Sequence, residues 1–244
     1  MDERRWLKGL GRRGGGRTRL LCFHYAGGSA AMFRQWWHLL PDSVEPVAVQ
    51  LPGRADRFGE PPHTTMAALV EDLVDVLGPV LDHPYACFGA SMGARVSWVL
   101  SHALRDRHLP MPRKLYVSSS SGPVLEEAVR GWDGTDDELV AYVRELGGTP
   151  PEVLDDSGLL TALLPVLRAD LTVLASHEYR PSTPLDVPVH VFAGRHDLES
   201  TPERMAAWRA ETSAAFDLDL IDTGHFLDDD AVRRVTDVIG RDLG

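Results

Sequence analysis

The stretch from Tyr85 to Arg95 constrains the fold of this chain more than any other part of its sequence. An apolar run at residues 85–88 leads into Gly89-Ala90-Ser91-Met92-Gly93, and a helical pattern of apolar residues follows. A serine flanked by glycines at this spacing, between a strand and a helix, is typical of a nucleophile elbow, a sharp turn that lifts the hydroxyl clear of a sheet. Side chains in place of the two glycines would collide with the neighbouring strand and helix. The motif predicts Ser91 as a nucleophile and the backbone N–H of Met92 as a donor to an oxyanion.

Short apolar runs alternate with helical patterns through most of the chain. This alternation predicts an α/β fold with a mostly parallel sheet and helices on both of its faces. The predicted strands are residues 19–24, 44–51, 85–88, 114–119, 187–193 and 216–221, of which the last alternates enough to lie near an edge. The predicted helices include residues 31–40, 66–77, a helix after Ser91 and a helix that begins in the acidic run 228–230.

Three residues with catalytic chemistry, Ser91, Asp197 and His225, each come directly after a predicted strand. Because the carboxyl ends of parallel strands meet at one edge of a sheet, these side chains are expected to converge. Their order along the chain is that of α/β-hydrolases. His225 would take the proton of Ser91 as a general base, and Asp197 would orient the imidazole. Asp222 remains an alternative acid, whereas the serine run 118–121 offers no carboxylate.

The segment Tyr25-Ala26-Gly27-Gly28-Ser29 follows the first predicted strand. Glycines allow the backbone to approach a ligand closely, so the N–H of Ala26 is predicted as the second donor of an oxyanion hole, beside Met92. An ordinary glycine turn before the helix at 31–40 would account for the same residues.

The region from Gly122 to about Pro184 interrupts the alternation and is expected to be a helical lid insertion over the active-site edge. Thr135 and Glu138 form a capping-box pattern at the start of one helix. A strongly apolar helical region runs from Leu159 to Leu174, and Pro165 is expected to break or kink it into two pieces. Some of its leucines are expected to line the substrate site, although leucines at helical spacing are more often simple core.

Residues 19–244 are expected to form one domain. A flexible arm at residues 1–18, rich in Gly and Arg, is expected to precede it. The formal net charge of -11 argues against partners such as nucleic acid or an anionic membrane. No apolar run is expected to be long enough to span a membrane. Cys22 and Cys87 are expected to be buried free thiols, and no spacing typical of a metal site is present. Without a signal-peptide pattern, the chain is expected to be cytoplasmic and to need no metal or cofactor.

Several motifs taken together resemble the type II thioesterases of polyketide and nonribosomal peptide synthases, which belong to the α/β-hydrolase superfamily. The motifs are Cys22-Phe23-His24-Tyr25-Ala26-Gly27-Gly28-Ser29, Leu51-Pro52-Gly53-Arg54, the elbow around Ser91, Gly194-Arg195-His196-Asp197 and Gly224-His225-Phe226. The resemblance runs from about Leu20 to the C-terminus. Relatives often have a proline before the Ala-Gly-Gly sequence, where this chain has His24-Tyr25.

The resemblance implies hydrolysis of short or aberrant acyl groups from the phosphopantetheine thiol of acyl- or peptidyl-carrier proteins. The phosphopantetheine would arrive as part of the substrate, and the enzyme would be a monomer. Carrier proteins are typically acidic, as is this chain, so a local basic patch at the entrance is expected to offset their repulsion. Arg34, Arg54 and Arg57 are the candidates for that patch.

Other functions share these features. A carboxylesterase or a medium-chain acyl thioesterase would have the same fold and triad. A chain-releasing cyclase would also share them, but such domains are usually fused to a synthase. A binding protein that keeps a hydrolase fold without activity is the alternative from another class, although such proteins commonly lose a triad residue and this chain keeps all three candidates.

Overall fold

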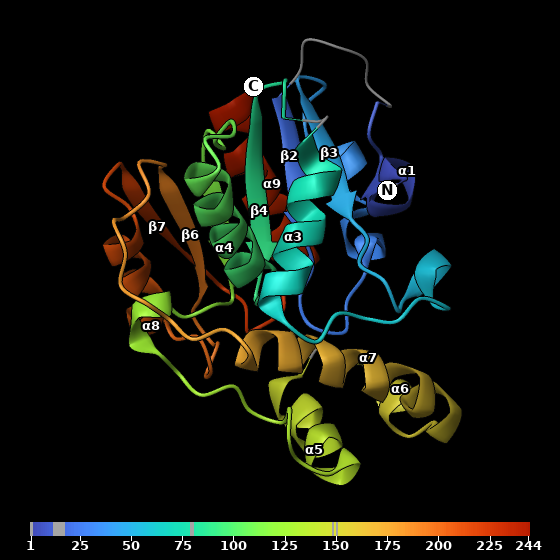
Figure 1. Cartoon of the computed structure of the whole chain (residues 1–244). Coiled ribbons are helices and arrows are strands. Elements are labelled where there is room, and N and C mark those ends of the chain that lie inside the picture. Colours follow the sequence, from blue (N-terminus) through green and yellow to red (C-terminus); the bar gives the residue numbers. More distant parts are fainter. Residues whose placement is uncertain (1, 12–17, 79–80, 148, 150) are drawn as a thin grey trace.

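The fold is built on a seven-stranded sheet in the order β1-β3-β2-β4-β5-β6-β7 (Figure 1). The computed structural model describes residues 2–11, 18–78, 81–147, 149 and 151–244. The strands are β1 (Leu7–Lys8), β2 (Thr18–Phe23), β3 (Val44–Val49), β4 (Tyr85–Ala90), β5 (Leu115–Ser118), β6 (Val189–Gly194) and β7 (Phe216–Ile221). Only β1 runs antiparallel among these described strands, and β7 forms the outer edge as its alternating sequence predicts. The carboxyl ends of β2 to β7 therefore share one edge of the sheet.

Helices cover both faces of the sheet, which confirms the predicted α/β-hydrolase class. One face packs against α3 (Met66–Leu77) and α4 (Met92–Asp106), and the other packs against α2 (Trp36–Leu39) and α9 (Asp229–Leu243) (Figure 1). The apolar stripe of α3 includes Leu69, Leu73 and Leu77, each at most 1% exposed. Two hydrophobic cores result, one on each side of the strands. Cys22 and Cys87 are buried and unbonded to each other, as predicted.

The predicted helix at residues 31–40 is two shorter pieces, a 3-10 helix η1 (Ala30–Phe33) and α2. The remaining short helices among the described residues are α1 (Glu3–Trp6), η2 (Ala55–Arg57), η4 (Pro123–Leu125), α8 (Pro202–Ala206) and η5 (Ala207–Glu211). Of these, α1 precedes β1, and α8 and η5 lie between β6 and β7.

The prediction of a flexible arm over residues 1–18 is wrong for the described residues 2–11 and Thr18. Residues 3–8 form α1 and β1, and β1 pairs with β3. Trp6 is 2% exposed and its indole lies beneath the guanidinium of Arg57, 4.1 Å from ring centroid to Cζ. Two apolar side chains and a strand pairing are enough to fix this segment, but they are too few to stand out as a pattern. Residues 12–17 lie outside the described residues.

The segment predicted as a lid contains η4, α5 (Asp136–Leu146), α6 (Pro151–Leu154) and α7 (Ser157–Ala175). Figure 1 shows these three α-helices below the carboxyl edge of the sheet. The predicted capping box between Thr135 and Glu138 is present at the start of α5. The predicted break at Pro165 is absent, because α7 continues through this residue as one helix. Leucines on both sides of the proline pack into one shared cluster, which offsets the lost backbone hydrogen bond.

Helix α7 also corrects the expectation that no apolar run could span a membrane. By length and composition it could do so, with a mean hydropathy of 1.6, and it is the one such helix among the described residues. Helices that cover the core of a globular fold pass the same test. In this structure, α7 carries the buried carboxylate of Asp170 and packs against α3 and α4.

Candidate active site

The turn between β4 and α4 has the geometry that the sequence predicts for a nucleophile elbow. Ser91 has φ 51° and ψ -113°, and a positive φ is uncommon for a residue with a side chain. A Cβ at Gly93 would lie 2.2 Å from the carbonyl oxygen of Phe23 in β2, and one at Gly89 would lie 2.4 Å from the backbone of α4. Both glycines are therefore required by backbone atoms that cannot move aside. Ser91 is held at this turn by a bond from its N–H to the carbonyl of Ser118 at 2.8 Å.

The side chains of Ser91, His225 and Asp197 form a continuous series. His225 Nε2 lies 3.4 Å from Ser91 Oγ, and His225 Nδ1 lies 2.9 Å from Asp197 Oδ2. Residues 134 positions apart in the chain thus meet because each follows a strand at the same edge of the sheet. Ser119 also contacts the histidine, because its hydroxyl donates to the carbonyl of His225 at 2.5 Å. The sequence indicated that the serine run lacks an acid but not that one of its hydroxyls holds the histidine loop.

Asp197 is 3% exposed and is fully engaged by hydrogen bonds. Its Oδ1 accepts the backbone N–H groups of Glu199 and Ser200, each at 2.9 Å, while its Oδ2 faces His225. Burial alone would raise the pKa of Asp197. The hydrogen bond and charge of His225, with the two N–H donors, lower this pKa below its usual value instead. Asp197 is therefore an ionised carboxylate at neutral pH, suited to stabilise a cationic imidazole.

The alternative acid, Asp222, lies elsewhere. Its carboxylate is 2.7 Å from His196 Nε2 on the surface, where both side chains are mostly exposed. The loops that carry Asp197 and His225 approach very closely, because a Cβ at Gly194 would lie 2.5 Å from the carbonyl oxygen of Gly224. This contact explains the glycine at the end of β6 and brings Asp197 within reach of the imidazole.

The glycine-rich loop after β2 lies beside Ser91. Ala26 and Met92, the two predicted oxyanion donors, line the same cavity as Ser91 and His225. In this loop, the N–H of Gly28 bonds to the carbonyl of Tyr25 at 3.0 Å, and the N–H of Gly27 bonds to Asp170 Oδ2 at 2.7 Å. Gly27 has φ +74°, so the turn uses the freedom of glycine at this position.

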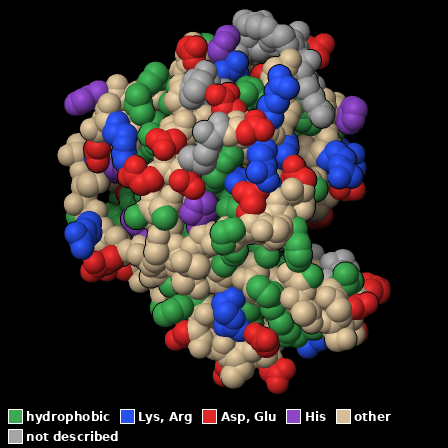
Figure 2. Space-filling model, turned by 45° about the vertical axis from the view of Figure 1, so that its right-hand side comes forward, with side chains coloured by type: hydrophobic (Ala, Val, Ile, Leu, Met, Phe, Trp, Pro, Cys, Tyr) green, Lys and Arg blue, Asp and Glu red, His purple; other side chains and the backbone are tan. Residues whose placement is uncertain are grey.

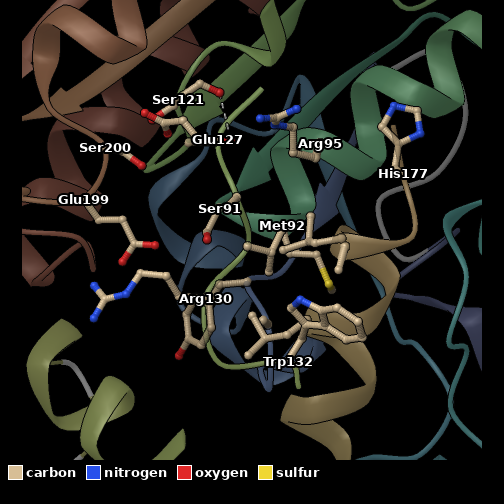
Figure 3. Close-up of a pocket in the computed structure, with 18 of the residues that line it drawn as sticks. Ser91, Met92, Arg95, Ser121, Glu127, Arg130, Trp132, His177, Glu199 and Ser200 are labelled. Atoms are coloured by element: carbon tan, nitrogen blue, oxygen red, sulfur yellow. Dashed lines mark hydrogen bonds between the residues drawn. The ribbon is translucent and has the colours of Figure 1, made fainter. Parts of the chain in front are cut away.

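A cavity of about 450 Å³ opens next to Ser91 under the covering helices. Its apolar lining residues include Tyr25, Met66, Trp132, Leu171, Leu174 and Phe226, so two of the leucines predicted to line the site do so. Its polar lining residues include Arg95, Glu127, Arg130, Glu199, Ser200 and His177. Figure 3 shows Glu199 and Arg130 on one side of Ser91 and Trp132 on the other. Of the polar residues, Arg95 was predictable, because it lies four residues after Ser91 on the same helix face.

Two of the three arginines proposed for a basic patch at the entrance are buried and cannot contribute to it. Arg54 is 6% exposed and pairs with Asp170, and Arg57 is 5% exposed and pairs with Glu60. Arg34 alone of the three is exposed. Both buried arginines follow a strand end where the chain turns inward, and each is neutralised by a nearby carboxylate. Figure 2 shows acidic and basic side chains interspersed over the face it presents.

A strained serine elbow at the carboxyl edge of a mostly parallel sheet, followed by an acid and a histidine in that order, defines an α/β-hydrolase. Among the described residues, no group of three or more His, Cys, Asp or Glu is placed to hold a metal ion. Residues 18–243 match the family model of the thioesterase domain. The chain belongs to this thioesterase family, whose reaction is the hydrolysis of thioesters.

Individual relatives agree with this assignment. The chain is 34% identical over 223 residues to the gramicidin S biosynthesis protein GrsT of Aneurinibacillus migulanus, covering 91% of this chain and 87% of that protein. Its structure resembles RedJ, a thioesterase from the prodiginine biosynthetic pathway in Streptomyces coelicolor, with a TM-score of 0.89 and 37% identity over 94% of this chain and 91% of RedJ. It also resembles the type II thioesterase BorB from the borrelidin biosynthetic cluster, with a TM-score of 0.85 and 28% identity over 100% of this chain and 97% of BorB.

Proposed function

We propose that this protein hydrolyses acyl groups from the phosphopantetheine thiol of acyl- or peptidyl-carrier proteins, with Ser91, His225 and Asp197 as its catalytic triad. The observation that carries the proposal is the series of contacts from Asp197 through His225 to Ser91, placed at the floor of a cavity that α7 covers. The similarity to GrsT, RedJ and BorB supports a role in polyketide or nonribosomal peptide biosynthesis.

The first half of the reaction transfers the acyl group to the enzyme. Ser91 Oγ attacks the thioester carbonyl while His225 Nε2 takes its proton, which forms a tetrahedral oxyanion. The C–S bond then breaks, and His225 returns the proton to the departing pantetheine sulfur. In the second half, His225 deprotonates a water that attacks the Ser91 ester, and the acid product leaves with Ser91 protonated again.

The other residues assist by holding charge. The Asp197 carboxylate keeps the His225 proton on Nδ1 and stabilises the imidazolium in each half-reaction. The backbone N–H groups of Ala26 and Met92 would donate to the oxyanion, and the loss of one such donor typically lowers kcat by about 100-fold to 1000-fold. Met92 is the first residue of α4, so its N–H also lies at the positive end of the helix dipole.

The cavity supports a small or medium acyl group as the substrate. A cavity of about 450 Å³, with Leu171, Leu174 and Trp132 among its lining residues, suits a short chain better than a long polyketide or peptide. No metal or cofactor takes part in the proposed reaction. The free buried thiols Cys22 and Cys87 are consistent with a place in the reducing cytoplasm. We propose that the enzyme acts as a monomer.

Mass spectrometry of acyl-loaded carrier proteins tests the proposal directly. Carrier proteins with acetyl, propionyl, butyryl, hexanoyl and aminoacyl groups are incubated with the enzyme, with Ser91→Ala as the matched control. Loss of the acyl mass from the carrier with wild type, and its retention with Ser91→Ala, is expected. Hydrolysis of p-nitrophenyl esters without hydrolysis of the carrier thioesters would indicate a carboxylesterase. Inactivity on both, with no labelling by a fluorophosphonate, would indicate a binding protein.

A further inference from the structure

The structure contains a buried ion pair that the proposed mechanism does not use. Arg54, in the loop after β3, is 6% exposed, and Asp170, on α7, is 2% exposed. Their contact is bidentate, with Arg54 Nη1 2.5 Å from Asp170 Oδ2 and Arg54 Nη2 2.8 Å from Oδ1. Removing two charges from water is expensive, so a pair this deep is weak evidence of a contribution to stability. Its position calls for another role.

Both members of the pair also bond to the loop that carries the predicted oxyanion donor. Asp170 Oδ2 accepts the N–H of Gly27 at 2.7 Å, the residue immediately after Ala26. Arg54 Nη1 donates to the carbonyl of Gly28 at 3.3 Å, and Arg54 Nε donates to the carbonyl of Pro52 at 3.1 Å. The pair therefore connects three segments: the loop after β2, the loop after β3 and the covering helix α7.

We propose that Arg54 and Asp170 are positioning residues that set the oxyanion hole through the Gly27 peptide. Asp170 draws the Gly27 N–H toward α7, and Arg54 holds the Gly28 carbonyl, so the turn between them has one orientation. That orientation determines where the N–H of Ala26 points. This inference rests on the proposed function, because it takes Ala26 as a donor to the oxyanion of the thioester reaction.

The charge of Asp170 explains why this acceptor must be paired with Arg54. A lone carboxylate beside the Gly27 N–H would repel an oxyanion that forms close to the same loop. The guanidinium of Arg54 neutralises Asp170 and lets it act only as a hydrogen-bond acceptor. Arginine suits this task because its fork can bind both carboxylate oxygens and still reach a backbone carbonyl, which a lysine ammonium cannot do.

The same contacts join α7 to the loop after β2, which carries Ala26. A Cβ at Gly27 would lie 3.4 Å from Leu167 Cδ1, so the helix packs directly on the turn. At the end of α7, Ser176 Oγ accepts the N–H of Met66 at the start of α3 at 2.8 Å. The C-terminal half of the covering helix is thus part of the oxyanion loop's support, and its placement and the placement of Ala26 are linked.

A matched pair of substitutions tests the proposal. Arg54→Lys keeps the positive charge next to Asp170 but loses the fork and the bond to Gly28. Arg57→Lys is the control, because Arg57 is equally buried in the same loop but bonds to Glu60 and the Gln50 carbonyl instead. Activity on acyl-pantetheine is expressed per active site, titrated with a fluorophosphonate, so an unfolded fraction does not count.

For Arg54→Lys, kcat per titrated site is expected to fall about 10-fold, less than the loss of a whole donor, while KM changes by less than about twofold. The inhibition constant of an alkyl boronic acid is expected to rise by the same factor, since its tetrahedral adduct with Ser91 places an oxygen in the oxyanion hole. Arg57→Lys is expected to match wild type in all three. A purely structural role would change the number of active sites but not these constants.

Asp170→Asn provides the second arm, because it keeps an oxygen for the Gly27 N–H but breaks the bidentate pair. The double variant Arg54→Lys/Asp170→Asn is expected to lose no more than the worse single variant, as for residues that act as one unit. If Arg54→Lys does not fold, Asp170→Asn alone is expected to show the same changes in kcat and in the boronate constant. Unchanged constants in the variants that fold would overturn the inference. Full activity of Ser91→Ala would instead overturn the proposed function.

Discussion

At the residue scale, the backbone of Ser91 adopts a positive φ that is uncommon for a residue with a side chain. The turn can form because Gly89 and Gly93 let β4, α4 and β2 approach to distances that no side chain tolerates. Both glycines could be predicted from the motif, because the tight turn from strand to helix requires them at these two positions. The strain is therefore built into the sequence at this position, and the catalytic hydroxyl is presented as a result.

Gly93→Ala is expected to destabilise the protein by about 3 kcal/mol, because its Cβ would meet backbone atoms of β2 at 2.2 Å. Gly59→Ala is the control, since nothing lies within 4 Å of the Cβ it would gain. Urea denaturation monitored by circular dichroism measures the difference. Equal midpoints for the two variants would show that the close approach of β2 and α4 is wrong.

Asp197→Asn is expected to lower kcat by about 10,000-fold, because an asparagine would favour the wrong tautomer of His225. Asp222→Asn, which changes the carboxylate paired with His196 on the surface, is expected to keep wild-type activity. Steady-state kinetics on acyl-pantetheine distinguish the two. A large loss with Asp222→Asn and none with Asp197→Asn would reverse the assignment of the acid.

At the scale of elements, the long strands and helices were the easiest to predict, and the short or exceptional ones were not. The apolar run at residues 44–49 and the apolar stripe of α3 each contain enough apolar residues at regular spacing to be recognised from the sequence alone. The helix and strand in residues 3–8 were not predicted, because only Trp6 and Leu7 bury their side chains there. The ion pair of Asp170 escaped because its partner, Arg54, is far away in the chain, although a single acid in an apolar helix is itself a signal of a buried partner.

The covering helices are expected to differ in their local stability. The second half of α7 is tied down by Asp170 and Ser176, whereas α5 buries only Leu139 and Val143. Amide hydrogen exchange followed by mass spectrometry is expected to be slower in residues 166–175 than in Asp136–Leu146. Equal exchange in the two segments would indicate that the whole region moves as one lid.

At the scale of the whole molecule, the fold and the meeting of Ser91, His225 and Asp197 could be predicted, because each of these residues follows a strand and a parallel sheet gathers the strand ends at one edge. The cavity could not, because its lining comes from segments far apart in the chain, among them the loop after β2, α7 and the loop after β7. The placement of charged side chains could not be predicted from the sequence either. Arg54 and Arg57 look like surface residues in the sequence, but each turns inward to a carboxylate that only the tertiary structure supplies.

The stability of the molecule is expected to decline as pH falls from about 6.5 to about 4. Burial, and secondarily the charge of Arg54, lower the pKa of His24 to about 4, so the folded protein keeps it neutral. The unfolded chain takes up the proton below about 6.5, so the stability this group contributes is complete above that value and is lost as pH falls through the window. For His24 the loss is roughly 3 kcal/mol.

Urea midpoints at pH 7, 5.5 and 4.5 measure this dependence. His24→Asn, which can still donate to the Tyr25 carbonyl, is expected to make this dependence shallower, while the exposed His38→Asn is expected to leave it unchanged. The same slope in His24→Asn and wild type would contradict the assignment of His24.

We propose that one serine, Ser91 at the β4–α4 turn, carries the thioesterase reaction. Titration with a fluorophosphonate, with peptide mapping of the label and parallel assay on an acyl-carrier protein, measures it most directly. We predict that activity falls in proportion to labelling, that it reaches zero at one equivalent, and that the label is on Ser91. Complete labelling of Ser91 with thioester hydrolysis intact would contradict the account.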